Sequence, residues 1–236
     1  MSALSLFEED VAPIRPEART ARRLIAGIDP DLKGAIVVLS DTDGPPLKFP
    51  MPTYKVPKKQ KGKKGNTLYW IVYDEVQIRS ILSGNDPDTG ISFNQGEPIP
   101  HVFIEKPLVS RESEPLRCDN CQHIVLMRTP EPSFSMSRKF EAFGLIRGIC
   151  CGLGVLPQLL HPRTWQARML DGAPSNLTTK GRAQYNAKRL FPSFDLREHD
   201  RCRVPYQGVC DALLIAEFGR RNLGLDLCVE DEELGF

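Results

Sequence analysis

The stretch LIAGIDPDLKGAIVVLS, residues 24–40, decides the fold that the sequence predicts. Apolar runs at 24–28 and 34–39 are typical of buried strands. The five residues between them, 29–33, are few enough for an antiparallel hairpin. Asp29 stands where the first run ends, so its carboxylate is held at the end of a buried strand. We therefore expect a strand pair that directs this acid to one edge of a sheet.

The composition is that of an ordinary globular protein. The 236 residues are 41% hydrophobic and 26% charged, and a formal net charge of +1 leaves any attraction to a polyanion to local patches. Seven irregularly spaced cysteines argue against a secreted disulfide framework and for a reducing compartment. No apolar run approaches the length of about 18 residues that a membrane span requires, so we expect none.

The order of elements predicts a single αβ domain. We expect a flexible N-terminal arm at 1–22, the domain at 23–225 and an acidic tail at 226–236. Insertions are expected at about 50–66, where a lysine run favours a mobile loop, and at 108–132. Further strand signals lie at 67–77, 101–107 and 155–162, and helix signals lie at 74–83, 137–154, 163–170, 178–192 and 208–224. This order predicts a mixed sheet with helices packed on it.

Three acids stand at the edges of apolar segments, where the fold directs their side chains. Asp29 follows the first strand, Glu105 follows the strand signal VFI, and Asp211 lies in the first turn of the last helix. Each acid alone is commonly a turn former or a partner of the helix dipole. Three converging carboxylates would repel one another, and such oxygen ligands suit Mg²⁺ or Mn²⁺. A pair of these ions would activate water and stabilise the leaving oxygen of a phosphodiester displacement.

The segments GIDPDLKGAIVVL (27–39), VFIEKP (102–107) and CDALLIAEFG (210–219), in that order, resemble the acidic motifs of RuvC-type Holliday junction resolvases. The chain is most similar to the chloroplast resolvases of the monokaryotic-chloroplast type and to RuvC-like relatives from phages and bacteria. The elements that match those relatives are MPT at 51–53, a glycine-rich helix at 140–154, Pro162 and Trp165 of a P..W element, and a K…A..LFP helix from Lys180 to Pro192.

The resemblance implies an α/β, RNase H-like fold with a mixed five-stranded sheet flanked by helices. It implies a crossover junction endodeoxyribonuclease that makes paired symmetric nicks in four-way junction DNA. Asp29, Glu105 and Asp211 would be its catalytic residues and would bind Mg²⁺ or Mn²⁺, two ions per site. Paired cuts imply a homodimer, for which the helix at 139–154 is the candidate interface. The same relatives suggest a chloroplast or other organelle nucleoid, or else the cytoplasm of a bacterium or a phage-infected cell.

Two adjacent positions depart from the family pattern. Bacterial RuvC has a further acid where this chain has Gly208, and the chloroplast relatives place His where this chain has Gln207. Glutamine orients water but cannot accept a proton as imidazole can. His199 and Asp200 would substitute if their loop folds back. These departures leave two alternatives open: a catalytically impaired junction-binding protein, or another RNase H-like nuclease that cuts flaps, branched DNA or RNA–DNA hybrids.

Basic and aromatic residues provide candidate contacts with DNA, and binding through them would depend on salt. Phe134 is expected to be exposed and to stack on splayed bases, whereas Phe140, Phe143 and Trp70 are expected in the core. The lysines at 55–64 are equally typical of a solvated loop. The candidate DNA-binding residues are Lys180, Arg182, Lys188, Arg138, Lys139, Phe134, Ser135, Lys58 and Lys59.

The pair Cys118 and Cys121, with His123 nearby, resembles half of a zinc site. A structural zinc needs four ligands, and no second pair of matching spacing follows. Cys202 and His199 are only distant partners in the sequence. We therefore expect free thiols here.

Overall fold

The computed structural model describes residues 23–41, 44–61, 65–108, 115–117, 124–127 and 133–224. The predicted arm at 1–22, the acidic tail at 226–236 and most of the insertion at 108–132 lie outside these residues. Within them, no helix has the length and apolar character that a membrane-spanning helix requires.

A mixed five-stranded sheet forms the centre of the domain, in the order β3-β2-β1-β6-β9. Its strands are β1 (Leu24–Asp29), β2 (Ala35–Ser40), β3 (Leu47–Pro50), β6 (His101–Glu105) and β9 (Gln158–Leu160). β1, β2 and β3 are successively antiparallel, whereas β6 is parallel to β1 and β9 is parallel to β6. The predicted mixed five-stranded α/β sheet and the opening hairpin are confirmed.

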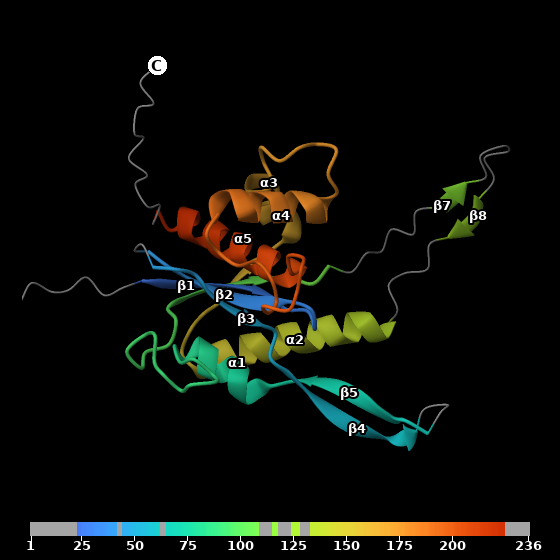
Figure 1. The fold of residues 1–236 in the computed structure, drawn as a ribbon, viewed down its shortest axis with the longest axis horizontal. Helices are drawn as coiled ribbons and strands as arrows, with labels where there is room; N and C mark the ends of the chain where they lie inside the picture. The colour runs from blue at the N-terminus through green and yellow to red at the C-terminus, as the bar shows by residue number, and fades with distance from the viewer. Residues whose placement is uncertain are drawn as a thin grey trace, which may run out of the picture.

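Helices cover both faces of this sheet, so the domain has three layers (Figure 1). One face carries α3 (Pro162–Met169), α4 (Thr179–Leu190) and α5 (Gln207–Asn222). The other carries α1 (Glu75–Leu82) and α2 (Ser133–Gly152). Both faces of β1 are therefore buried, and its apolar residues alternate between two cores: Ile25 packs toward α5, and Ala26 and Ile28 pack toward α1 and α2.

Helix α5 lies directly on the sheet because glycines stand at the points of contact. A Cβ atom at Gly27 would lie 2.2 Å from the Ala212 carbonyl oxygen, and one at Gly219 would lie 2.4 Å from the Phe103 ring. Side chains from Val209 to Gly219 are buried, apart from the partly exposed Asp211. The close approach fixes where each residue of α5 stands relative to β1.

Strands β4 (Thr53–Lys61) and β5 (Thr67–Tyr73) form a separate antiparallel hairpin that extends away from the three layers (Figure 1). The prediction of a mobile loop is wrong for residues 55–61, which lie in β4 with four of the six lysines, and residues 62–64 lie outside the described residues. The prediction that Trp70 belongs to the core is also wrong, because its side chain is 46% exposed and the Lys58 ammonium lies 3.7 Å from its ring centroid. Phe140 is 44% exposed as well, against expectation. A second small hairpin joins β7 (Pro115–Arg117) to β8 (Ile124–Met127).

Candidate active site

Asp29 and Glu105 lie side by side at one edge of the sheet. β1 and β6 are parallel, with Ile28 opposite Ile104, so the next residue of each strand is an acid. Parallel strands present paired residues to the same face of a sheet. Ile28 and Ile104 face α1 and α2. The two carboxylates therefore turn to the opposite face, toward α5.

Helix α5 brings Asp211 to the same place. Gly27 faces α5 at the closest contact between strand and helix, beside the carbonyl of Ala212. Asp29 is two residues further along β1 and thus on the same face, and Asp211 immediately precedes Ala212. Three segments far apart in the chain are brought together in this way, which is the arrangement that the sequence motifs predict.

The three carboxyls are neighbours that resist ionisation. Burial raises the pKa of Asp29 well above its ordinary value, and Glu105, Asp211 and Asp31 raise it further. Burial and then Asp211 raise the pKa of Glu105 to about 7. Burial also raises the pKa of Asp211 to about 6, against the opposing effects of Gln207 and Lys180. Without a cation, the cluster therefore retains protons close to neutral pH.

The carboxylates do not form a closed ligand cage. Among the described residues, a set of three potential ligand atoms within 4.8 Å of one another is found at Glu198, His199 and Cys202, and the three acids do not form such a set. They are close enough to influence one another electrostatically, but their oxygens are more widely spread than that limit. Side-chain rotation would have to draw them around one ion.

Gln207, the first residue of α5, fixes the orientation of Asp211. Its Nε2 donates to Oδ1 of Asp211 at 2.9 Å and to Oδ2 at 3.0 Å. Its Oε1 accepts a hydrogen bond from Nε2 of Gln184 on α4 at 3.2 Å. The amide thus acts directly on the carboxylate of Asp211.

The glycine at position 208 has a packing reason. A Cβ atom there would lie 2.2 Å from the Lys33 carbonyl oxygen and 2.7 Å from the backbone of Gly34. The first turn of α5 therefore rests against the turn between β1 and β2. A side chain larger than that of glycine therefore has no room at this position.

A pocket of about 400 Å³ opens beside Asp29 and Glu105. Its basic groups include Lys106, Lys139 and Arg163, which would attract an anionic substrate. The full lining is Asp29, Pro30, Asp31, Glu105, Lys106, Pro107, Leu108, Lys139, Pro162, Arg163 and Gln166. Sequence reasoning missed Asp31, Lys106 and Arg163, although each lies within two residues of a motif residue that it singled out.

Trp165 lies in α3, next in the chain to Gln166 of the pocket. Its ring is buried, and its indole nitrogen has no hydrogen-bond partner of normal geometry. The indole N–H nevertheless lies near enough to Glu105 to lower the pKa of that carboxyl. A donor aimed at the ionised form of Glu105 partly offsets the effect of burial.

Lys139 and Lys180 lie close to the acids. Lys139 on α2 lowers the pKa of Asp29 and of Glu105, and Lys180 on α4 lowers that of Asp211. Two of the predicted DNA contacts, Lys139 and Lys180, therefore lie near the acid cluster, one in each of the two helical layers.

The two candidate arginines are engaged within the protein. Arg138 donates to a carboxylate oxygen of Glu141 at 2.6 Å and to the carbonyl oxygen of Ile71. Arg182 donates from Nη2 to the carbonyl oxygen of Leu170 at 2.8 Å. These contacts assign both guanidinium groups to holding helices in place, so their predicted role in DNA binding gains no support.

The other predicted DNA contacts are spread over the surface. Lys188 is exposed on α4, and Lys58 and Lys59 lie on the β4–β5 hairpin. The backbone of Phe134 and Ser135 lies in the first turn of α2, and their side chains are outside the described residues.

The loop before α5 does not supply the expected substitutes for the missing acid. The Asp200 side chain is 99% exposed and lies 3.8 Å from Arg197, and His199 lies against the thiol of Cys202. Neither residue is among the groups that shift the pKa values of the three acids. The loop is therefore not folded back among them.

Comparison with known proteins finds a weak structural similarity to RuvC. No family model matches the chain, and no curated protein matches it. The structure of Thermus thermophilus RuvC overlaps with a TM-score of 0.40 and 14% identity, covering 86% of this chain and 97% of that one. T. thermophilus RuvC in complex with a Holliday junction substrate overlaps with a TM-score of 0.40 and 13% identity, with the same coverage. At so low a similarity, function has to be inferred from the residues themselves.

Proposed function

We propose that this protein is a metal-dependent, structure-specific DNA endonuclease of the Holliday junction resolvase type, built on an RNase H-like fold. The observation that carries the proposal is the meeting of Asp29, Glu105 and Asp211 on one face at one edge of the sheet. The ordered motif resemblance supplies the substrate class, four-way junction DNA. Its cellular compartment stays a prediction.

The three acids suit a hard divalent cation. Burial raises the pKa of each, neighbouring carboxyls raise those of Asp29 and Glu105 further, and a bound cation would reverse that balance. Asp29, Glu105 and Asp211 would hold Mg²⁺ or Mn²⁺, two ions in the proposed form. When bound, such ions generate a nucleophilic water and stabilise the leaving oxygen of a phosphodiester.

The surrounding residues would hold the DNA strand and the acids in place. Lys139 and Lys180 flank the carboxylates and would bind phosphates on either side of the cut, with Arg163 at the pocket. Gln207 would keep Asp211 oriented through its paired hydrogen bonds. The β4–β5 hairpin, with its lysines and exposed rings, would contact a more distant part of the junction.

Two symmetric cuts require two active sites, so a homodimer belongs to the proposal. The candidate interface is α2. Along this helix a Cβ atom at Gly144, Gly148 or Gly152 would meet nothing within 4 Å, and Phe140 is 44% exposed. Small residues beside an exposed ring would let a second copy of the helix approach closely.

Cleavage of an end-labelled mobile four-way junction in Mg²⁺ or Mn²⁺ tests the function. We expect paired, symmetric nicks from the wild type. Asp29→Asn should lower the rate by at least about a thousandfold, more than the 10- to 100-fold that loss of an outer-shell contact costs a metal site. Junction binding in Ca²⁺ should persist in this variant. Flaps and RNA–DNA hybrids serve as competing substrates, and faster cutting of either would identify a different nuclease.

A junction-binding protein without catalysis is the second candidate, and one observation favours it. The Gln207 amide donates to both oxygens of Asp211, so it occupies ligand atoms that a metal ion would need. If the wild type bound junctions tightly but did not nick them with either ion, this second function would replace the first.

A further inference from the structure

We propose a second metal site, for Zn²⁺ or a cation of similar softness, formed by Glu198, His199 and Cys202 in the loop that leads into α5. Their ligand atoms all lie within 4.8 Å of one another. Sγ of Cys202 is 3.5 Å from Nε2 and 3.7 Å from Nδ1 of His199. A small rotation of the ring would turn either nitrogen toward an ion shared with the thiolate.

The donor set separates this site from the acid cluster. Thiolate, imidazole and carboxylate are the ligands that Zn²⁺ takes in proteins, with four-coordinate geometry, whereas Mg²⁺ takes oxygen ligands. Three protein ligands would leave one position for water. His199 is exposed, so an ion can reach the loop from solvent. We therefore expect this site to select zinc even where magnesium is abundant.

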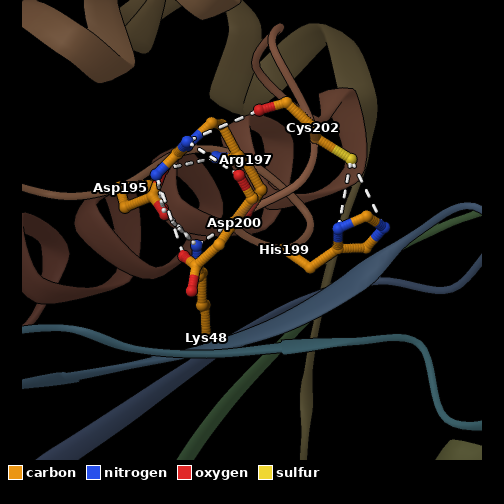
Figure 2. A network of polar contacts seen from close by, with 6 residues as sticks. All are labelled: Lys48, Asp195, Arg197, His199, Asp200 and Cys202. Atoms are coloured by element: carbon orange, nitrogen blue, oxygen red, sulfur yellow. Dashed lines mark hydrogen bonds and ion pairs between the residues drawn. The ribbon is translucent and has the colours of Figure 1, made fainter.

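The loop is ordered by contacts of Lys48 and Arg197 that leave the ligand side-chain atoms of Glu198, His199 and Cys202 unused (Figure 2). Nζ of Lys48, on β3, donates to the carbonyl oxygens of Asp195 at 2.7 Å and of Arg197 at 2.6 Å. Arg197 donates in turn to the carbonyl oxygen of Asp200 at 3.2 Å and to that of Cys202 at 3.5 Å. The hydrogen bonds from Lys48 join the loop to the sheet, and those from Arg197 join two parts of the loop. Together they hold the backbone that carries the ligands in place before any ion binds.

The cations of this network are neutralised locally. Lys48 lies 3.1 Å from a carboxylate oxygen of Asp195, and Arg197 lies 2.8 Å from the other. Asp200 provides a second, more distant anion for Arg197 at 3.8 Å. Lys48 and Arg197 therefore present paired rather than uncompensated positive charges to an entering metal ion.

The proposed site adjoins the acid cluster through Tyr206, the residue that precedes α5. Burial raises the pKa of its phenol to about 12, and Glu198, Asp29, Asp31 and Cys202 raise it as well. The next residue, Gln207, is the one that holds Asp211. An ion bound to the loop would therefore fix the start of the helix that carries one of the three acids.

Cobalt substitution of the full-length protein tests this site. Co²⁺ is added in excess Mg²⁺, and the thiolate-to-cobalt charge-transfer absorption is followed, with a chelator titration for Zn²⁺ affinity. We expect one equivalent of Co²⁺ to produce the absorption in the wild type. Cys202→Ser should abolish it, and both Cys202→Ser and His199→Ala should lower Zn²⁺ affinity by at least about a hundredfold, the upper end of the loss from an outer-shell change.

Three controls decide where the thiolate ligand lies. Cys151→Ser removes an exposed thiol on α2 and should keep the absorption. The double variant Cys118→Ser/Cys121→Ser should keep it too. Asp29→Asn should also keep it, which separates this site from the acid cluster. Circular dichroism verifies that each variant is folded. Absence of the absorption from the wild type, its survival in Cys202→Ser, or its loss from the double variant would each overturn the proposal.

Discussion

The acid cluster and the β4–β5 hairpin differ in how far their functional groups are exposed to solvent: the acids are largely buried, and the aromatic rings of the hairpin are exposed. The acids are held by a parallel strand pair and by a helix that touches the sheet through glycines, so each is in a fixed and electrostatically costly position. The hairpin places Tyr54, Tyr69 and Trp70 in solvent, each at least 46% exposed. We expect the buried acids to control chemistry and the exposed rings of the hairpin to control affinity. Substitutions in the two regions should therefore affect different measurements.

Of the substitutions considered, Glu105→Gln should have the largest effect, and it should change both the cleavage rate and the stability. Cleavage should fall by at least about a thousandfold, because the amide is a poorer metal ligand than the carboxylate. The metal-free protein should nevertheless become more stable at pH 7, by about 2 kcal/mol, since a neutral side chain avoids the charge that burial opposes. Urea unfolding and junction cleavage of the same preparation measure both effects. Lost cleavage with reduced stability would show that Glu105 is a structural residue instead.

The gain in stability should depend on pH. The pKa of Glu105 rises from 4.5 to about 7 on folding. Between these values the unfolded chain has released a proton that the folded protein retains, so the free energy of unfolding falls as pH rises. Below about pH 4 the carboxyl is neutral in both states, and the advantage of Glu105→Gln should disappear. An advantage that grew toward acid pH would contradict the raised pKa.

Gly208→Asp tests whether the site can accept the acid that the motif resemblance leads one to expect at position 208. Its Cβ atom would lie 2.2 Å from the Lys33 carbonyl oxygen, so we expect a loss of about 3 kcal/mol in stability and no gain in cleavage. Gly181→Ala is the matched control, because Gly181 is also a helical glycine but the added atom would meet nothing closer than 3.4 Å. That change should stabilise the protein by about 0.5–1 kcal/mol. Faster cleavage by a stable Gly208→Asp would show that α5 has room to move.

The hairpin should give the smallest effects, confined to binding. Trp70→Ala should weaken junction binding by about 1–2 kcal/mol through lost stacking. Lys58→Ala should reduce the slope of log affinity against log salt by about 1. Cleavage at saturating protein should be unchanged. Ile91→Ala, which removes another apolar side chain that is 67% exposed, should alter nothing. Equal effects of Trp70→Ala and Ile91→Ala would remove the hairpin from the DNA-binding surface.

Local signals in the sequence are sufficient to predict most of the regular elements. The helix predicted at 178–192 is observed as Thr179–Leu190, because the Thr178 side chain caps its start and a proline follows its end. The opening strand pair is equally clear from its apolar runs. Lysine and proline, by contrast, are poor strand formers, and β4 exists through its pairing with β5, so composition alone predicts a loop there.

The candidate site is predictable in its acids but not in its surroundings. The motifs single out Asp29, Glu105 and Asp211 because each ends or begins an apolar segment. Packing decides the rest: only the contact of α5 with the β1–β2 turn explains Gly208, and only the fold of the loop brings Glu198 beside His199 and Cys202. The spacing of His199 and Cys202 in the sequence is a usable signal for two of these three residues. The position of Glu198 gives no such signal.

The outer strands of the central sheet also bear on how the protein behaves at high concentration. β3 and β9 are the edges of the sheet, and they are only four and three residues long. β3 also carries Lys48, whose ammonium is held between the sheet and the loop before α5. A strand from another molecule that paired with β3 would gain few hydrogen bonds and would lie next to the ion pair between Lys48 and Asp195. The edges of the sheet are thus poor templates for aggregation, a protection that Lys48→Val would weaken.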